Sequence, residues 1–148
     1  MTMQYKKVLV AVDGSKEAEW ALKKAIEVCK RNHAELVIGH VIDTRNYPTL
    51  EAYDMTIRDR AEEFAGEILD KYKAIAEKEG IQAVTEIELG SPKVKITKSL
   101  AVKHNVDLIM CGATGLNAVE RFLIGSVSEN IVRTSPCDVL IIRSEKDN

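Results

Sequence analysis

Lys7-Val-Leu-Val-Ala-Val12 is an apolar, largely β-branched run that stops abruptly at Asp13-Gly14-Ser15. The run predicts a buried strand, and the polar tripeptide after it predicts a turn into a helix that Gly14 or Ser15 can cap. Asn32 is the predicted end of that helix. Small and apolar residues recur along the helix at spacings of three and four: Ala18, Ala21, Leu22, Ala25, Val28 and Cys29. Because three of these residues are alanines, the helix can pack closely on a sheet.

The alternation of strand and helix continues along the chain. Further strands are predicted over residues 34–42, 81–89, 106–111 and 138–143, and further helices over residues 50–79, 92–104 and 126–133. The first turns of the 50–79 helix are expected to be separate from the rest. Its apolar stripe is predicted to contain Tyr53, Ile57, Ala61, Phe64, Ile68, Tyr72 and Ile75.

Five strands that alternate with helices predict an α/β fold, with a parallel sheet covered by helices on both faces. The 81–89 strand alternates charged and apolar residues near its end, which indicates a sheet edge with one solvated face. No linker or repeat divides the sequence, so we expect residues 1–148 to form a single domain.

Composition and charge exclude several classes of protein. The 148 residues are 45% hydrophobic, and 21 basic against 23 acidic side chains give a net charge of −2. Because these charges are interleaved, a nucleic-acid surface is not expected. No apolar run approaches the roughly 18 residues of a membrane span. The apolar run near the N-terminus is also too short for a signal peptide, so we expect a cytoplasmic protein.

The cysteines are scattered, at Cys29, Cys111 and Cys137, without a C-x-x-C pair. This pattern argues against both a disulfide framework and a zinc site. We interpret the three residues as small buried side chains in a reducing compartment. The histidines have no metal-ligand spacing either, so protein side chains alone are not expected to hold a metal.

The most informative segment for function is Gly112-x2-Gly115-x9-Gly125-Ser126, which links a predicted strand to a predicted helix. Ligands of open parallel sheets bind beyond the carboxyl ends of the strands. Gly112 and Gly115 allow a ligand to approach the backbone. Amides and hydroxyls at the start of the helix can hold phosphate oxygens, and the residues concerned are Ser126, Val127 and Ser128. The alternative is that the glycines only turn corners and Ser126 only caps the helix.

Other phosphate-binding motifs are absent from the sequence. No G-x-x-x-x-G-K-[ST] motif is present, which excludes a P-loop lysine at a γ-phosphate. The first strand is not followed by G-x-G-x-x-G, which excludes the dinucleotide-binding fingerprint. The phosphate hypothesis therefore depends on the 112–126 segment.

The glycine spacing resembles the nucleotide-binding pattern G-2x-G-9x-G-(S/T) of the universal stress protein family, in its ATP-binding branch. Other stretches carry the same resemblance: V-L-V-A-V-D-G-S, G-H-V-I-D, G-S-P and G-S-V-S-E-N-I-V-R-T-S-P-C-D-V-L-I-I-R. The resemblance implies a Rossmann-like fold with strand order 3-2-1-4-5. It also implies that ATP binds, with Mg²⁺ or Mn²⁺ held through its phosphates.

The resemblance further implies which residues bind the nucleotide. The end of the first strand would line the ribose and phosphates, with Asp13 as a partner of the metal, although an ordinary helix cap is the alternative for Asp13. The Val41 backbone would meet the adenine edge, and Gly112 would contact the ribose. The implied nucleotide-binding residues are Ala11, Val12, Asp13, Val41, Cys111, Gly112, Ala113, Thr114, Gly115, Gly125, Ser126, Val127 and Ser128.

Enzymatic activity has little support in the sequence. Fast hydrolysis needs an oriented water, a base and charge stabilisation, and only Asp13 with a metal and Arg121 are candidates. We interpret His40 as a packed residue. We therefore expect slow ATP hydrolysis or none, and a nucleotide-dependent switch in stress response that unidentified protein partners read. The alternatives are a sensor of AMP or a cyclic nucleotide, or a dimeric interaction module without functional nucleotide binding.

The last predicted strand is apolar on both faces, at Val139, Leu140, Ile141 and Ile142. With the implied strand order it lies at a sheet edge, where it can pair with its symmetry mate. The resemblance implies a homodimer through this strand, and a monomer with a protected edge is the alternative. Whether residues 44–56 close over the nucleotide is left open by the sequence.

Overall fold

The computed structural model describes residues 3–46, 55–113 and 124–143, which form a five-stranded parallel sheet and its covering helices. The elements in chain order are β1 (Lys7–Ala11), α1 (Lys16–Asn32), β2 (Glu35–Asp43), the 3₁₀ turn η1 (Thr44–Asn46), α2 (Met55–Lys78), β3 (Ala83–Gly90), α3 (Pro92–Lys95), the π-helical turn η2 (Ile96–Leu100), α4 (Ala101–Lys103), β4 (Leu108–Gly112), α5 (Ser126–Thr134) and β5 (Asp138–Ile142). All five predicted strands are present within two residues of their predicted bounds.

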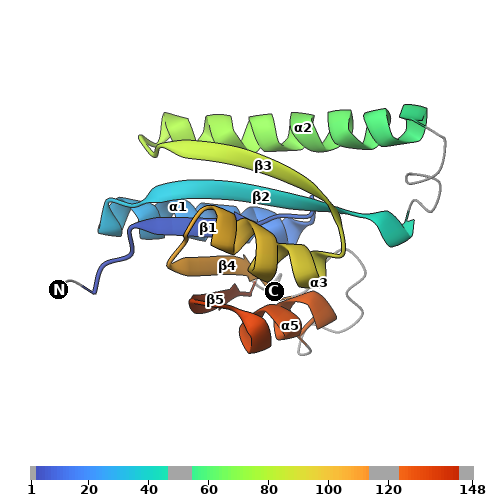
Figure 1. Ribbon diagram of the computed structural model, residues 1–148. Helices are drawn as coiled ribbons and strands as arrows, with labels where there is room; N and C mark the ends of the chain where they lie inside the picture. The colour runs from blue at the N-terminus through green and yellow to red at the C-terminus, as the bar shows by residue number, and fades with distance from the viewer. Residues whose placement is uncertain (1–2, 47–54, 114–123, 144–148) are drawn as a thin grey trace, which may run out of the picture.

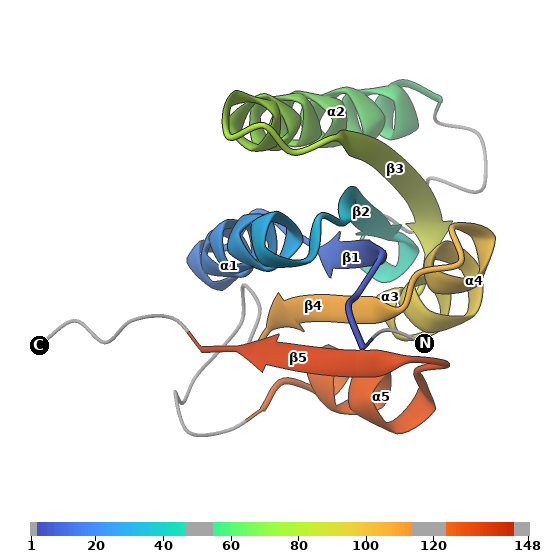
Figure 2. The ribbon, with the colours of Figure 1, turned by 90° about the vertical axis from the view of Figure 1, so that its left-hand side faces the viewer.

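The strand order is β3-β2-β1-β4-β5, which confirms the predicted 3-2-1-4-5 order (Figure 1). In this order β1 lies in the centre, and every pairing is parallel. Helices α1 and α2 cover one face of the sheet, while α3, α4 and α5 cover the other, as the turned view in Figure 2 shows. The predicted α/β class, with helices on both faces, is therefore confirmed.

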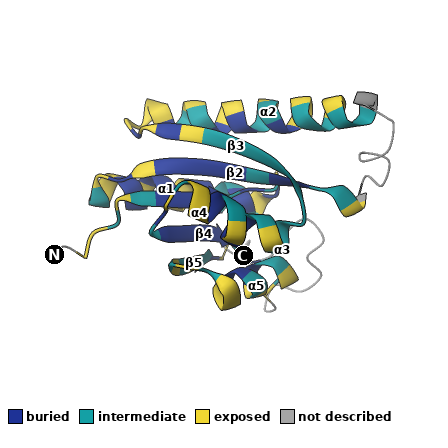
Figure 3. Ribbon diagram, in the orientation of Figure 1, coloured by how far each residue is buried: buried dark blue, intermediate teal, exposed yellow. Residues whose placement is uncertain are grey.

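The central strands are apolar on both faces because each face contributes to a separate core (Figure 3). In β1, Val8 and Val10 pack with α1 and α2, whereas Leu9 packs with the helices of the opposite face. All six residues of the predicted α1 stripe are buried, as expected. The Ser15 hydroxyl caps α1 by accepting a hydrogen bond from Ala18 N at 3.1 Å. The helix ends at Asn32, because His33 takes a left-handed conformation with φ of 54°.

The predicted stripe of α2 is partly wrong. Phe64 was placed on the buried face, but its side chain is 66% exposed. The buried residues of the helix are Ala65, Leu69, Tyr72 and Ala76. Around the helix axis, Phe64 lies roughly a third of a turn from the centre of this buried face. Apolar spacing alone therefore did not distinguish the buried face from the exposed one. Tyr53 lies outside the described residues. Neither α2 nor any other helix in the described ranges is long and apolar enough to cross a membrane.

The predicted 92–104 helix is interrupted by η2, a π-helical turn that the sequence did not predict. Ser91 is the N-cap residue as expected, but its side chain makes no capping hydrogen bond. Thr97 in η2 is 1% exposed, and its hydroxyl lies 3.2 Å from the Thr134 hydroxyl of α5. The π-helical turn therefore contributes a polar link between the two helical elements on this face.

The edge position of β3 is confirmed, and the face predicted to be solvated is exposed at Val84 but partly covered at Glu86 and Glu88. Glu86 pairs with Lys103 and with His104, each at 3.0 Å, and Glu88 accepts hydrogen bonds from the Ser99 hydroxyl at 2.6 and 2.8 Å. The hydrogen bond from Lys103, together with His104, lowers the pKa of Glu86. The glutamates therefore hold the η2 and α4 segment against the edge strand.

The cysteines differ in burial. Cys29 and Cys111 are buried as predicted, whereas Cys137 is only half-buried, and all three thiols are free. Burial raises the pKa of Cys29 to about 12. Since a thiolate is the reactive form of cysteine, burial keeps Cys29 unreactive at neutral pH.

Candidate functional site

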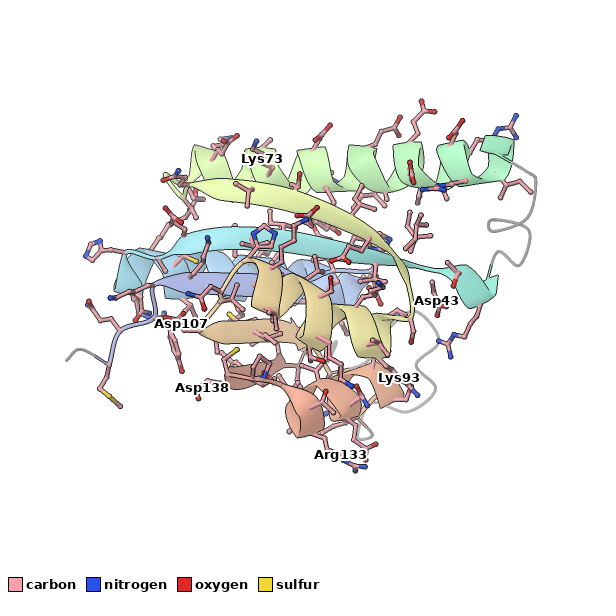
Figure 4. All side chains as sticks on the ribbon, viewed as in Figure 1. Asp43, Lys73, Lys93, Asp107, Arg133 and Asp138 are labelled. Carbon is pink, nitrogen blue, oxygen red and sulfur yellow. The ribbon has the colours of Figure 1, made fainter. Side chains whose placement is uncertain are left out.

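The carboxyl ends of β1, β2 and β4 meet at one edge of the sheet. Ala11, the last residue of β1, lies between Gly39 of β2 and Cys111 of β4. Figure 4 shows Asp43 and Lys93 toward this edge, whereas Asp107 and Asp138 lie at the opposite one. Ligands of open parallel sheets bind at the edge formed by the carboxyl ends, so the candidate site lies there.

The turn after β1 is held by one backbone hydrogen bond to β2 and one hydrogen bond to its own Asp13 side chain. Val12 N donates to Gly39 O at 2.9 Å, which extends the pairing with β2 by one residue. Asp13 Oδ1 accepts from Ser15 N at 2.9 Å, and Gly14 takes φ of 87°. Ser15, and not Asp13, is the N-cap of α1. The Asp13 carboxylate therefore braces the turn at the sheet edge, and the alternative role of an ordinary helix cap is wrong.

Gly112, at the end of β4, lies directly against the first turn of α1. A Cβ atom on Gly112 would be 2.8 Å from Glu17 Cβ and 3.1 Å from the Glu17 carbonyl carbon. A real Cβ does not approach other atoms so closely, so α1 can occupy its position only if residue 112 is glycine. Helix packing is therefore sufficient to explain this glycine, whether or not a ligand also approaches it.

The start of α5 is fixed by two backbone hydrogen bonds. Gly125 N donates to Ala113 O, and Ala113 N donates to Ile142 O, both at 2.8 Å. These bonds anchor the helix start beside the end of β4. The amides of Ser126, Val127 and Ser128 occupy the first three helical positions, which have no carbonyl partner within a helix. They form the positive end of the helix dipole.

The Ser128 hydroxyl is not directed to a ligand, contrary to expectation. Ser128 is 6% exposed, and its Oγ donates to Gly112 O at 2.6 Å. At the third helical position this side chain points back to β4, so it joins the helix to the strand. Ser126, in contrast, is exposed. Of the two predicted hydroxyls, only that of Ser126 is accessible for a phosphate group.

The Val41 backbone faces the position where β1 ends. Alternate residues of a strand direct their peptide groups to opposite neighbours, and Gly39 O faces β1 because it accepts from Val12 N. The peptide group of Val41, two residues later, therefore points to the same side, beyond the last paired residue of β1. The Val41 side chain is 7% exposed and packs in the core. The residue thus presents a backbone donor and acceptor at the sheet edge.

Cys111 contributes packing to the site. Its side chain is 5% exposed, and its sulfur lies 3.9 Å from Ser128 Oγ. Burial raises the pKa of Cys111 to about 11, and the negative charge of Asp13 acts in the same direction. The thiol therefore stays protonated at neutral pH and supports the ends of β4 and α5.

The structure brings together most of the residues that the sequence predicted for the site. Ala11, Val12, Asp13, Val41, Cys111, Gly112, Ala113, Gly125, Ser126, Val127 and Ser128 belong to the ends of β1 and β4, to β2 and to the start of α5. Thr114, Gly115 and Arg121 lie outside the described residues, as does most of the 44–56 segment. Sequence reasoning interpreted His40 only as a packed residue and did not predict that its Nδ1 lies 2.7 Å from Val12 O. Its position in an otherwise apolar strand was the only signal.

The donor set fits a metal that arrives with phosphates. Asp13 supplies one carboxylate at the sheet edge, and the described residues contain no cluster of three or more possible metal ligands. Mg²⁺ in nucleotide sites is typically held by one or two carboxylates together with phosphate oxygens and water. Asp13 is therefore the residue that would contact such an ion.

Comparisons with known proteins agree on one family. The sequence model of the universal stress protein family matches residues 4–143. A relative from Staphylococcus aureus strain USA300, named as a universal stress protein, is 54% identical over 143 residues. That match covers 96% of this chain and 86% of the relative. The similarity therefore extends over nearly the whole chain.

Solved structures show the same fold. The hypothetical protein MJ0577 superimposes with a TM-score of 0.88 at 30% identity, covering 98% of this chain and all of that one. A universal stress protein solved in complex with cAMP gives a TM-score of 0.71 at 26% identity and covers 96% of this chain and 99% of its own. The latter shows that a protein of similar fold holds an adenine nucleotide.

Proposed function

Since the chain belongs to the universal stress protein family, we propose that it binds an adenine nucleotide at the carboxyl ends of β1 and β4. The proposed ligand is ATP, with Mg²⁺ or Mn²⁺ held between its phosphates and Asp13. Occupancy of the site would act as a switch in the stress response by changing the surface that protein partners contact. The proposed setting is the cytoplasm.

The observation that carries this proposal is the anchored start of α5. Three amides at one helix end, Ser126 to Ser128, form an anion site whose position is fixed by the bond from Gly125 N to Ala113 O. A hydrogen bond to a charged group contributes about 1.5–3 kcal/mol. Three such bonds supply roughly 4.5–9 kcal/mol, a range that includes the roughly 8 kcal/mol of micromolar binding.

The other end of the nucleotide has a matching surface. The Val41 peptide group offers both a donor and an acceptor, which is the pattern that the edge of adenine requires. Asp13 lies between this strand end and the phosphate site, because β1 separates β2 from β4 in the sheet. The arrangement supports a ligand with its base at β2, its ribose at β1 and its phosphates at α5.

A monophosphate or cyclic nucleotide is the second candidate ligand. The cAMP complex of a structural neighbour favours it. The two candidates differ in their need for a metal, because AMP or cAMP lacks the β- and γ-phosphates that hold Mg²⁺ with a carboxylate. Binding measured with and without the ion therefore separates them.

We expect purified protein, once denatured, to release ATP at about one molecule per chain, identified by chromatography and mass spectrometry. Titration of nucleotide-free protein should give micromolar affinity for Mg-ATP, and Asp13→Asn should weaken binding only when Mg²⁺ is present. Stronger binding of AMP or cAMP, without metal dependence, would support the second candidate. A protein that is empty and binds none of the three would contradict nucleotide binding.

We also propose that the chain forms a homodimer through β5. Leu140 on this edge strand is 41% exposed, although the strand is apolar from Val139 to Ile142. Leu140→Asp should convert the dimer to a monomer in sedimentation velocity, since a charge on an apolar edge opposes pairing. Val84→Asp is the matched control, because Val84 is 44% exposed on β3, the opposite edge. A dimer that survives Leu140→Asp, or is lost with Val84→Asp, would place the interface elsewhere.

A further inference from the structure

The half-buried imidazole of His40 lies at the point where β1 separates from β2. His40 Nδ1 is 2.7 Å from the carbonyl oxygen of Val12, the residue that precedes Asp13. A carbonyl oxygen can only accept a hydrogen bond, so Nδ1 must carry the proton and donate. This contact fixes the tautomer of the neutral ring, with Nε2 left as the acceptor.

The hydrogen bond from His40 to Val12 O takes the place of the next backbone hydrogen bond between β1 and β2. Gly39 O accepts from Val12 N, and the regular continuation of this pattern would join Val12 O to Val41 N. In the structure the Val12 carbonyl accepts from the imidazole. The ring thus occupies the fork between the strands, where β1 turns out of the sheet and the Val41 peptide group faces the site.

Helix α2 lies close to the turn that follows Val12, on the same face of the sheet as His40. A Cβ atom on Gly14 would lie 3.8 Å from Ile68 Cδ1, so the helix packs over the turn. Leu36 and Ile38 of β2 belong to the core beneath α1 and α2, and by alternation His40 faces the same side. The turn therefore begins at a carbonyl that is hydrogen-bonded to His40 of β2, and the Ile68 side chain of α2 lies near Gly14 on the same face.

We infer that His40 is a positioning residue that holds the fork between β1 and β2 open. By taking the Val12 carbonyl, it sets the direction of the Asp13 turn and leaves the Val41 peptide group directed to the ligand. The residue acts through Val12 and does not itself contact the nucleotide. The ligand part of this inference rests on the proposed function, whereas the effect on the turn does not.

Two substitutions separate the hydrogen bond from the packing. His40→Asn keeps a donor, because the Asn side-chain nitrogen can occupy the place of Nδ1 on the same branch of the side chain. His40→Leu fills similar space without a donor. Leu36→Val is the control for general destabilisation, since Leu36 is 1% exposed on the same face at the other end of β2.

The first readout needs no ligand. In the wild-type protein, ¹⁵N-detected NMR should show a protonated Nδ1 on His40. Hydrogen exchange at Ser15 N, which donates to Asp13 Oδ1, should accelerate about three- to tenfold in His40→Leu, as the loss of one net hydrogen bond allows. Exchange should stay near wild type in His40→Asn and Leu36→Val. An unprotonated Nδ1, or unchanged Ser15 exchange in His40→Leu, would overturn the inference; if His40→Leu does not fold, the Nδ1 assignment decides.

The second readout is nucleotide affinity. His40→Leu should weaken Mg-ATP binding by about three- to tenfold, while His40→Asn and Leu36→Val bind as the wild type does. Equal affinity in all four proteins would overturn the role of His40 toward the ligand. A wild-type protein that binds no adenine nucleotide would instead contradict the proposed function, and the exchange data would still decide the role of His40 in the turn.

Discussion

Replacement of Ser126 by proline is expected to remove most of the nucleotide affinity and to leave the fold intact. Proline has no N–H group, so the substitution deletes one of the three amides that form the proposed phosphate site. A charge-assisted hydrogen bond of about 1.5–3 kcal/mol corresponds to roughly a 10- to 150-fold increase in Kd. No side-chain substitution at this position tests the backbone so directly.

The local geometry is already suited to proline. Ser126 is the first residue of α5, the helical position where proline is favoured because its amide has no partner within the helix. The residue before proline must be extended, and Gly125 has φ of −64° and ψ of 158°. Because neither condition requires the backbone to move, we expect the melting temperature of Ser126→Pro to stay close to that of the wild type.

Ser126→Ala is the matched control because it removes the hydroxyl and keeps the amide. Calorimetric titration with Mg-ATP should show a moderate loss for the alanine variant and a larger loss for the proline variant. Circular dichroism on both variants checks that the helix content is unchanged. Equal affinity of Ser126→Pro and Ser126→Ala would mean that this amide does not contact the phosphates.

The strand order and class of the fold were predictable because the strands are short apolar runs bounded by strong turn residues. The helical details were less predictable. Phe64 fits an apolar spacing as well as Ala65 does, and only the position of α2 over β2 and β3 decides which of them is buried. The π-helical turn at Ile96–Leu100 depends on tertiary contacts, such as that between Thr97 and Thr134, that local sequence does not encode.

The location of the candidate site was predictable from the sequence, but the contacts that its individual side chains make were less so. Glycine spacing identified the end of β4 and the start of α5, although Gly112 is required by the close approach of α1 and Gly125 has φ of −64°, which other residues also adopt. The pattern could not show that Ser128 bonds to Gly112 O or that His40 bonds to Val12 O. Both are long-range contacts to backbone carbonyl oxygens. Because every residue has a carbonyl group, the sequence does not indicate which one accepts the hydrogen bond.

The same reasoning explains why the sequence alone says little about which nucleotide the proposed site would prefer. The groups that the proposed site would offer to a base and to phosphates are largely peptide groups, at Val41 and from Ser126 to Ser128. Their positions depend on how β1, β2, β4 and α5 pack, so substitutions that move the elements should affect binding as strongly as those at exposed side chains. Gly112 provides the clearest test, because α1 rests against it.

Gly112→Ala is expected to destabilise the fold and to weaken nucleotide binding together. The added Cβ would lie 2.8 Å from Glu17 Cβ and 3.1 Å from a Glu17 backbone atom, so a flexible side chain cannot relieve the clash. Overpacking of this kind costs about 1–3 kcal/mol. The first turn of α1 must move away from β4, and it carries with it the Asp13-Gly14-Ser15 turn that precedes it.

Gly66→Ala is the matched control for the same chemical change. A Cβ at Gly66 meets no atom within 4 Å, and alanine in a helix is favoured over glycine by about 0.5–1 kcal/mol. Denaturant unfolding should therefore show a lower free energy of unfolding for Gly112→Ala and a higher one for Gly66→Ala than for the wild type. Only Gly112→Ala should bind Mg-ATP less tightly. If Gly112→Ala is as stable as the wild type but loses affinity, then ligand approach, and not the packing of α1, is the reason for this glycine.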